Sequence, residues 1–260
     1  MGSLGCPCLF FYDCHTMIES ILLSAVPIFT YDIDTPLTNA SGFFFARDER
    51  LFLVTSRHVI YDEPSKHFPS RLEIELHTNA QNMAQSIGFS IPLYRDGQSL
   101  WRQTNDAAGE VDVALIEIDR AALPVTAVYQ AFTPAHLVAM NHQVEVGSSL
   151  LVVGFPLGFH DTLHHMPVVR QAIIASSFGL RFQGQGYFLT DARTHRGTSG
   201  APVVMRIMHP TVDQATLPWL LLGVHSARLD VGSRDIEVDE ALGLNCAWYA
   251  DILNTLTGPY

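Results

Sequence analysis

Three side chains of complementary chemistry stand in separate motifs of the 260-residue chain. Ser199 lies in the small-residue run 197–200, where a sharp turn would leave its hydroxyl group accessible. His58 follows one apolar run, and Asp112 lies at the start of another. A serine nucleophile, a histidine that accepts and returns its proton, and a carboxylate that orients the histidine together perform acyl transfer. The chain order His, Asp, Ser is one in which such triads occur.

Gly197 adds a second part of this chemistry. Because glycine has no Cβ, Gly197 lets the backbone N–H groups of residues 197 and 199 converge on one point. Two such donors beside a serine oxygen would stabilise the oxyanion of a tetrahedral intermediate. The run is common in ordinary loops when it stands alone, so its weight comes from the presence of His58 and Asp112.

The motifs together resemble those of the trypsin-like (chymotrypsin-fold) serine peptidases, most of all the protease domain of the bacterial HtrA-type enzymes. The likeness extends over residues 38–256 and rests on five separated parts of the chain: 55–59, 111–115, 154–158 with 167–170, 190–200 and 222–226. It implies a serine endopeptidase, a hydrolase that needs no cofactor or metal. His58, Asp112 and Ser199 would be catalytic, and the N–H groups of Gly197 and Ser199 would form the oxyanion hole. Nothing after residue 256 reads as a PDZ domain.

The same resemblance bears on the substrate. Ser226 stands where the family often has a serine that donates to the triad carboxylate. His225, Thr194 and the neighbouring Arg193 are similar to the pocket of the glutamyl endopeptidases, and they imply an acidic residue, Glu before Asp, just before the scissile bond. Histidine with threonine also binds glutamine in some viral chymotrypsin-like proteases, so Gln is the nearest rival. If Arg193 points to solvent and His225 only fills its strand, small apolar residues are expected instead.

Short apolar and alternating runs must position these residues. They predict strands at 25–31, 42–46, 51–55, 71–77, 89–93 and 111–119, then at 148–155, 168–176, 186–191, 201–205, 219–225 and 242–248, and a helix at 250–256. We therefore expect an all-β fold of two six-stranded antiparallel barrels with a short C-terminal helix. The expected divisions are a loose N-terminal extension (1–19), an N-terminal barrel (20–120), a linker (121–146) and a C-terminal barrel with the terminal helix (147–260).

Composition narrows the class of partner. The formal net charge of −11 argues against nucleic acid and anionic membrane surfaces, and no apolar run is long enough to cross a membrane. Three of the four cysteines crowd into the first 14 residues, so none is placed to link the two halves. This favours a reducing compartment, and we expect a cytoplasmic protein that acts on protein or peptide substrates.

Two other functions and one other site fit parts of the pattern. A catalytically silent peptide-binding module could use the same fold, and an esterase could use the same triad. The intact reactive positions count against the first, and a strand at 221–227 suited to pairing with an extended peptide counts against the second. His160, His164 and His165 share one loop, where a solvated loop is a better interpretation than a metal site.

Overall fold

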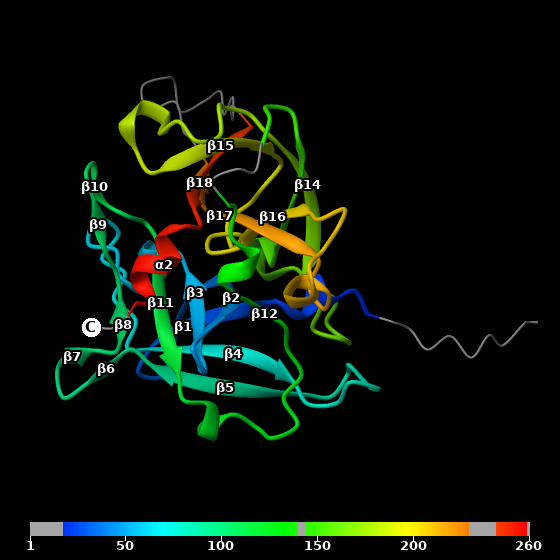
Figure 1. Cartoon of the computed structure of the whole chain (residues 1–260). Coiled ribbons are helices and arrows are strands. Elements are labelled where there is room, and N and C mark those ends of the chain that lie inside the picture. The colour runs from blue at the N-terminus through cyan, green and yellow to red at the C-terminus, as the bar shows by residue number, and fades with distance from the viewer. Residues whose placement is uncertain (1–17, 140–143, 229–242, 259–260) are drawn as a thin grey trace, which may run out of the picture.

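The computed structural model describes residues 18–139, 144–228 and 243–258, and these form two β-rich lobes (Figure 1). The expected extension 1–19 falls largely outside the described residues, as do Cys6, Cys8 and Cys14. The fourth cysteine, Cys246, is buried and has no disulfide partner in the part of the chain that the structure describes.

The first lobe is a large open sheet. Its strands are β1 (Ala25–Asp32), β2 (Thr35–Arg47), β3 (Arg50–Thr55), β4 (Arg71–His77), β5 (Ser86–Pro92), β8 (Trp101–Arg102), β11 (Ala114–Ile118) and β12 (Ala131–Phe132). They are ordered β5-β4-β1-β2-β3-β11-β8, and the pairs along this path are antiparallel, whereas β12 adds to β2 in parallel.

The predicted closed six-stranded barrel in this lobe is therefore wrong. The terminal strands β5 and β8 do not pair with each other. The chain between them turns away as a separate hairpin of β6 (Tyr94–Arg95) and β7 (Gln98–Ser99), and β9 (Asn105–Asp106) pairs with β10 (Gly109–Glu110) in another. The β6–β7 hairpin occupies the chain between β5 and β8, whereas the β9–β10 hairpin follows β8 and precedes β11.

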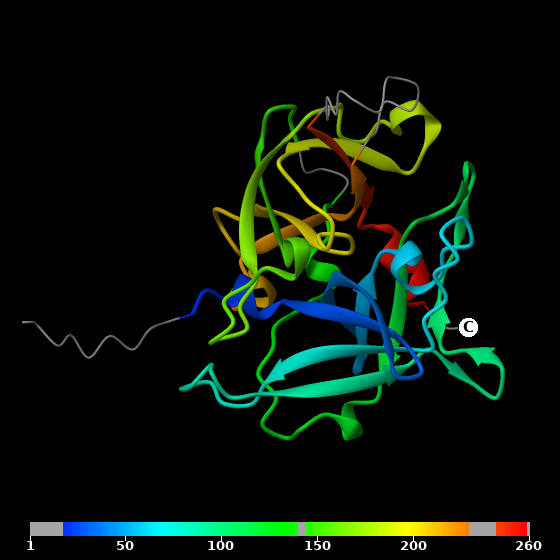
Figure 2. The same ribbon diagram turned by 180° about the vertical axis from the view of Figure 1, so that it is seen from behind.

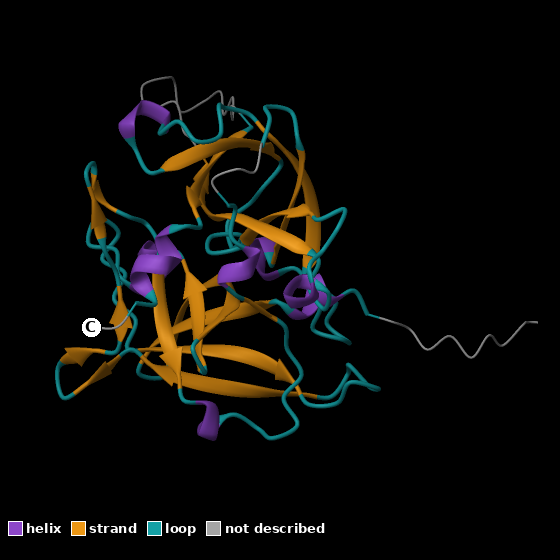
Figure 3. Ribbon diagram, in the orientation of Figure 1, coloured by secondary structure: helices purple, strands orange, loops and turns teal. Residues whose placement is uncertain are grey.

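The second lobe is a closed barrel, as the sequence predicts. Its strands are β13 (Ser149–Gly154), β14 (Val168–Ile174), β15 (Tyr187–Ala192), β16 (Pro202–Arg206), β17 (Trp219–Arg228) and β18 (Leu244–Tyr249). They close in the order β13-β14-β15-β18-β17-β16. Figure 3 shows that strands dominate both lobes and that the helical segments are short.

The helical segments mostly sit at connections. They are η1 (Ser20–Leu23), α1 (Arg57–Ile60), η2 (Arg120–Ala122), η3 (Pro134–His136), η4 (Pro156–Gly158), η5 (Phe182–Gly184), η6 (Val212–Gln214) and α2 (Ile252–Leu256). Helix α2 lies where the lobes meet, because side chains of the first lobe reach it: Arg47 donates to the Asn254 carbonyl oxygen at 2.8 Å. Within the described residues, no helix combines the length and apolar character needed to cross a membrane.

The core of the first lobe continues into the second. Strand β3 alternates between two packed faces: Phe52 and Val54 join one apolar cluster, whereas Leu51 and Leu53 join another. This explains why β3 reads as a continuous apolar run rather than an alternating one. The cluster that holds Phe52 also holds Leu221 of β17, so the two lobes share buried apolar surface. Shared burial holds the lobes in one relative position, which any site between them requires.

Candidate active site

His58 and Asp112 come from neighbouring strands of the open sheet. His58 lies on the single turn α1, directly after β3, and Asp112 lies two residues before β11. Because β3 and β11 pair antiparallel, with Thr55 opposite Ala114, the end of one strand meets the start of the other. His58 Nδ1 and Asp112 Oδ2 are 2.7 Å apart, and the His58 backbone N–H donates to Asp112 Oδ1 at 2.9 Å. Both carboxylate oxygens thus hold one residue, which orients the imidazole ring.

Ser226 of β17 contacts the same carboxylate from the other lobe. Its hydroxyl group donates to Asp112 Oδ2, the hydrogen bond that the family resemblance implies. Asp112 therefore accepts three hydrogen bonds while its side chain is largely buried. A buried carboxylate needs such donors, because an unsatisfied charge away from water is costly.

These contacts move the pKa values of the pair apart. Burial lowers the pKa of His58, but the hydrogen bond and negative charge of Asp112 outweigh it, so the pKa lies above the ordinary 6.5. Burial raises the pKa of Asp112, but hydrogen bonds from His58 and Ser226 and the His58 charge bring it below its ordinary value. The pair is thus a stable carboxylate beside a histidine of increased basicity.

Ser199 is presented by the turn before β16. Its Oγ donates to the carbonyl oxygen of Ser226 at 2.9 Å. Among the described residues no hydrogen bond joins this hydroxyl group to His58, so the nucleophile and the base are not directly bonded in this structure. Such bonds are often long in free enzymes and tighten when substrate binds. Ser226 therefore contacts both Asp112 and Ser199, one through its side chain and the other through its backbone.

Two N–H groups of the turn around Ser199 have no acceptor in the described part of the protein. Thr198, Gly200 and Ala201 donate their backbone N–H groups to carbonyl oxygens, whereas Gly197 and Ser199 do not. Gly197 has a φ of +87°, a conformation that side chains rarely adopt, and an added Cβ would lie 2.6 Å from the Phe155 carbonyl oxygen. The turn thus leaves free the two donors that the sequence analysis singles out.

Two small buried serines that the sequence analysis missed, Ser41 and Ser56, connect the two lobes at this site. Ser41 Oγ donates to the Gly197 carbonyl oxygen at 2.8 Å and accepts the Phe155 N–H at 2.9 Å. Ser56 Oγ, next to α1, donates to the His225 carbonyl oxygen at 3.1 Å. The signal for Ser41 was present in the sequence, since a run of small residues at 39–42 interrupts an otherwise bulky segment. Its partners could not be inferred from that signal.

The remaining predicted site residues take different positions. Thr194 is buried, and its hydroxyl group donates to Asn245 Oδ1. The Asn245 amide is oriented by its Nδ2, which donates to the Ala192 carbonyl oxygen at 2.7 Å. His225 is buried, and its Nδ1 has no hydrogen-bond partner in the described structure. Arg193 is exposed.

His225 differs from His58 in the direction of its pKa shift. Burial, followed by the nearby charge of His58, lowers the pKa of His225 to about 4. At neutral pH the ring is therefore uncharged and carries one N–H donor and one nitrogen acceptor.

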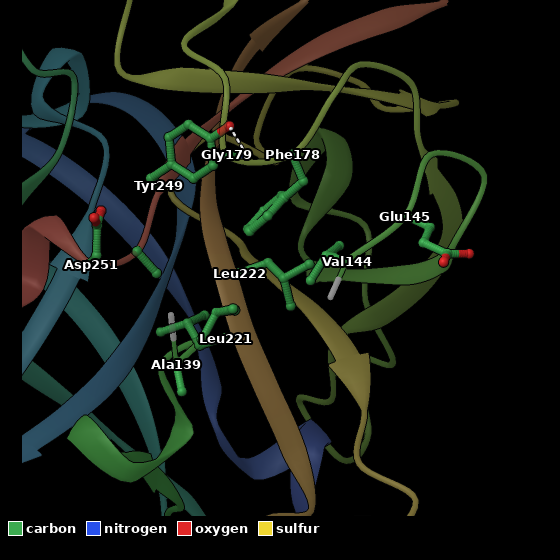
Figure 4. Close-up of a pocket in the computed structure, with 11 residues that line it drawn as sticks. Ala139, Val144, Glu145, Phe178, Gly179, Leu221, Leu222, Tyr249 and Asp251 are labelled. Carbon is green, nitrogen blue, oxygen red and sulfur yellow. Dashed lines mark hydrogen bonds between the residues drawn. The ribbon is translucent and has the colours of Figure 1, made fainter. Parts of the chain in front are cut away.

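Other cavities and clusters lie away from these residues. A cavity of about 550 Å³ is lined by parts of β17, the 144–145 segment and the 178–179 turn, and includes Phe178, Leu222 and Tyr249 (Figure 4). Neither His58 nor Ser199 lines it. Within the described ranges no three His, Cys, Asp or Glu side chains are arranged to hold a metal ion, and His164 contacts Asp161 and His165 contacts Glu75 as separate pairs.

The architecture is mostly β, with one closed six-stranded barrel beside a second large antiparallel sheet. The profile of the trypsin-like peptidase domain family matches residues 40–206, which is more than half of the chain, and the protein belongs to that family. The fold is similar to the crystal structure of the serine endoprotease from Yersinia pestis, with a TM-score of 0.54 and 16% sequence identity. The match covers 92% of this chain and 62% of that one. No curated protein sequence matches significantly.

Proposed function

We propose that this protein is a serine endopeptidase that hydrolyses peptide bonds through an acyl-enzyme. Family membership supports a peptidase that acts on protein substrates. The observation that carries the proposal is the arrangement of His58, Asp112 and Ser199, each on a different segment, with Ser226 in contact with two of them. The HtrA-type branch and a cytoplasmic location remain part of the proposal.

In this mechanism His58 removes the proton from Ser199 as its Oγ attacks the substrate carbonyl carbon. The raised pKa of His58 suits this role, because a stronger base accepts the proton more readily. The free N–H groups of Gly197 and Ser199 receive the oxyanion. His58 then gives its proton to the leaving amine, and water repeats the sequence to release the acyl group.

The proposal includes a preference for Glu before the scissile bond. His225 supports it as a buried polar residue beside the nucleophile segment: its backbone N–H donates to the Ala201 carbonyl oxygen at 2.9 Å, and its carbonyl oxygen accepts the Gly200 N–H at 2.7 Å. A carboxylate needs donors, and its arrival would favour the protonated ring, which supplies a charge-assisted hydrogen bond.

Hydrogen bonding at Thr194 also supports Gln, the second candidate. The Thr194 hydroxyl proton is committed to Asn245, so this oxygen can only accept a hydrogen bond from substrate. A neutral His225 and an accepting Thr194 would complement a carboxamide, which has both a donor and an acceptor. The two candidates therefore differ in whether His225 gains a proton on binding.

Peptides that differ only in the residue just before the scissile bond, which is Glu, Gln, Val or Lys, test the proposed specificity. The Glu-to-Gln ratio of kcat/KM should fall as pH rises from 5 to 8, by up to about tenfold per pH unit, because binding Glu needs a proton that binding Gln does not. Protonation of His58 affects kcat/KM for both substrates equally, so it does not change the ratio. A dominant preference for Val or Lys that survives His225→Ala would contradict the proposed specificity, and no cleavage at all would favour a silent peptide-binding module.

A further inference from the structure

The loop between β13 and β14 displays large apolar side chains to solvent. Leu157 is 63% exposed, Phe159 is 70% exposed and Leu163 is 63% exposed, all within seven residues. Single exposed apolar residues are ordinary, but several on one short loop indicate a binding surface. We call Leu157 and Phe159, which flank Gly158 in and after η4, the apolar strip.

The apolar strip lies directly beside the candidate oxyanion hole. The Leu157 N–H donates to the carbonyl oxygen of Arg196, the residue before Gly197. A Cβ placed on Gly197 would lie 2.9 Å from Leu157 N and 3.0 Å from Asn39 Oδ1. One placed on Gly158 would lie 2.8 Å from Asn39 Nδ2, so Asn39 fills the space between the two glycines. The backbone of the strip at Leu157 and Gly158, together with the Asn39 side chain, thus borders the turn around Gly197 and forms one wall of the candidate site.

This wall stands at the end of the nucleophile segment away from His225. Residues 197–200 contact η4 through Gly197 at one end, and they contact β17 through the hydrogen bond from Gly200 to His225 at the other. If His225 receives the side chain before the scissile bond, the part of the substrate after that bond extends toward the opposite wall. The apolar strip is then placed to contact the departing residues.

The backbone conformation of Leu157 indicates that a leucine at this position does not contribute to the stability of the fold. Its φ is +55°, in the left-handed region where leucine is disfavoured. A leucine in a core could offset such strain by burial, but this side chain is mostly exposed and gains little burial. Strained residues of this kind concentrate at functional sites.

The far end of the loop is attached to the first lobe. His77 Nε2 contacts the His164 carbonyl oxygen at 2.7 Å, and His165 Nδ1 lies 3.0 Å from Glu75 Oε2, with His77 and Glu75 both on β4. The loop therefore spans from the barrel to the open sheet, and the views from the front and from behind agree on this arrangement (Figure 2). Contacts at both ends present the apolar strip in one position before a substrate arrives.

We propose that the apolar strip binds a bulky apolar side chain, such as Leu or Phe, in the first one or two residues after the scissile bond. This inference rests on the proposed peptidase function and adds a substrate class to it. The peptide that leaves would carry this side chain at or near its new N-terminus. The strip would act as a specificity determinant on the leaving-group side.

Added amines that compete with water for the acyl-enzyme test binding on the leaving-group side of the site separately from binding of the acyl group. The full-length protein is supplied with a peptide ester, and Leu-amide, Phe-amide or Gly-amide competes with water for the acyl group. The amine nitrogen attacks the ester carbonyl carbon, a C–N bond forms, the C–O bond to Ser199 breaks, and His58 carries the proton from the amine to Ser199 Oγ. The ratio of aminolysis to hydrolysis comes from one intermediate, so it does not depend on the amount of active enzyme.

We expect Leu-amide and Phe-amide to intercept the acyl-enzyme about tenfold better than Gly-amide, the discrimination typical of an apolar pocket. Leu157→Asn, which suits a left-handed backbone, and Phe159→Ser should each reduce this preference to about twofold or less. Met208→Ser, at an apolar position that is 80% exposed in the connection from β16 to β17, is the matched control and should keep the full preference. Melting temperatures establish that each variant is folded.

Three outcomes would overturn the inference. Equal interception by Gly-amide and Leu-amide in the wild type, with normal ester turnover, would overturn this inference alone. So would a preference that persists in the Leu157→Asn, Phe159→Ser double variant. An absence of both ester turnover and labelling by a fluorophosphonate would overturn the proposed peptidase function and this inference with it.

Discussion

The two lobes contribute histidines whose environments act in opposite directions. In the open sheet, His58 faces a carboxylate, and its pKa is raised above 6.5. In the closed barrel, His225 has no partner at Nδ1 among the described residues, and burial lowers its pKa to about 4. The open lobe thus presents a base to the site, whereas the barrel presents a neutral ring. Under the proposed function, His58 would transfer protons and His225 would recognise the substrate, because the two rings have different partners.

The lobes also differ in how they hold their reactive groups. His58 and Asp112 are positioned by one pair of adjacent strands, so their contact needs only the register of β3 and β11. The position of Ser199 depends on close packing between the lobes. Ser41 of the open sheet donates to the Gly197 carbonyl oxygen and accepts the Phe155 N–H, and both partners belong to the barrel lobe. We therefore expect substitutions in the His58–Asp112 pair to reduce turnover alone. Substitutions where the two lobes pack together should also lower the free energy of unfolding.

Asp112→Asn should have the largest effect on turnover. Loss of the carboxylate favours the wrong imidazole tautomer, and kcat should fall by about 10⁴ at neutral pH. In the wild type, kcat/KM should rise with pH through a pKa above 6.5, because His58 must be neutral to accept a proton. Steady-state kinetics with Glu117→Gln, an exposed carboxylate on β11, provides the matched control. A loss of less than tenfold in Asp112→Asn would show that the pair is not catalytic.

Gly200→Ala should break the junction between the lobes. An added Cβ would lie 2.2 Å from both the Ser41 carbonyl oxygen and Thr55 Oγ1, and φ is +85°. Gly147→Ala has a similar φ of +84° with open space around it, so it measures the conformational cost alone, about 1 kcal/mol. Guanidinium unfolding should place the free energy lost in Gly200→Ala at least about 2 kcal/mol above that control. Equal losses in the two variants would mean that the junction relaxes without strain.

His225 should make the protein sensitive to acid. Its folded pKa of about 4 lies below the unfolded value of 6.5, so the neutral ring contributes stability that is complete above pH 6.5. That contribution is lost as pH falls toward 4, and amounts to roughly 3 kcal/mol. Unfolding free energies of the wild type and of His225→Gln should therefore converge or cross over this range. Parallel pH dependences in the two proteins would contradict the buried neutral state.

Ser226→Ala should have a smaller effect on turnover than Asp112→Asn. It removes one donor from Asp112 but leaves the His58 contacts, so kcat should fall by about tenfold. Ser56→Ala is a matched change, because this buried hydroxyl group also crosses between lobes but donates to a backbone carbonyl oxygen. We expect it to change kcat by less than about threefold. A larger loss in Ser56→Ala than in Ser226→Ala would reverse our ranking of the two contacts.

Sequence patterns predicted the strands whose formation depends on the local order of apolar and polar residues. The strand at 71–77 alternates in burial as its sequence does, and the apolar runs around His58 and Asp112 imply strands that end at the site. The closure of the first lobe was not predictable in this way. Whether β5 meets β8 depends on the route of the chain between them, and no periodicity reports that route.

The candidate site shows the same division. Ser199, His58 and Asp112 were identifiable because the chemistry needs those residue types. Ser41 and Asn39 instead contribute through contacts with segments that are distant in the sequence. The hydrogen bond from Thr194 to Asn245 joins residues 51 positions apart. It decides whether Thr194 can donate to a substrate, and only the packed barrel reveals it.

Labelling of Ser199 tests the central claim most directly. A fluorophosphonate reacts with an activated serine, and mass spectrometry locates the modified residue. We predict that the wild type is labelled at Ser199 and cleaves peptides, and that Ser199→Ala loses both properties. Ser177→Ala, at an exposed serine in the connection between β14 and β15, should keep both. Labelling that persists in Ser199→Ala, or peptide cleavage at the wild-type rate in that variant, would contradict the account.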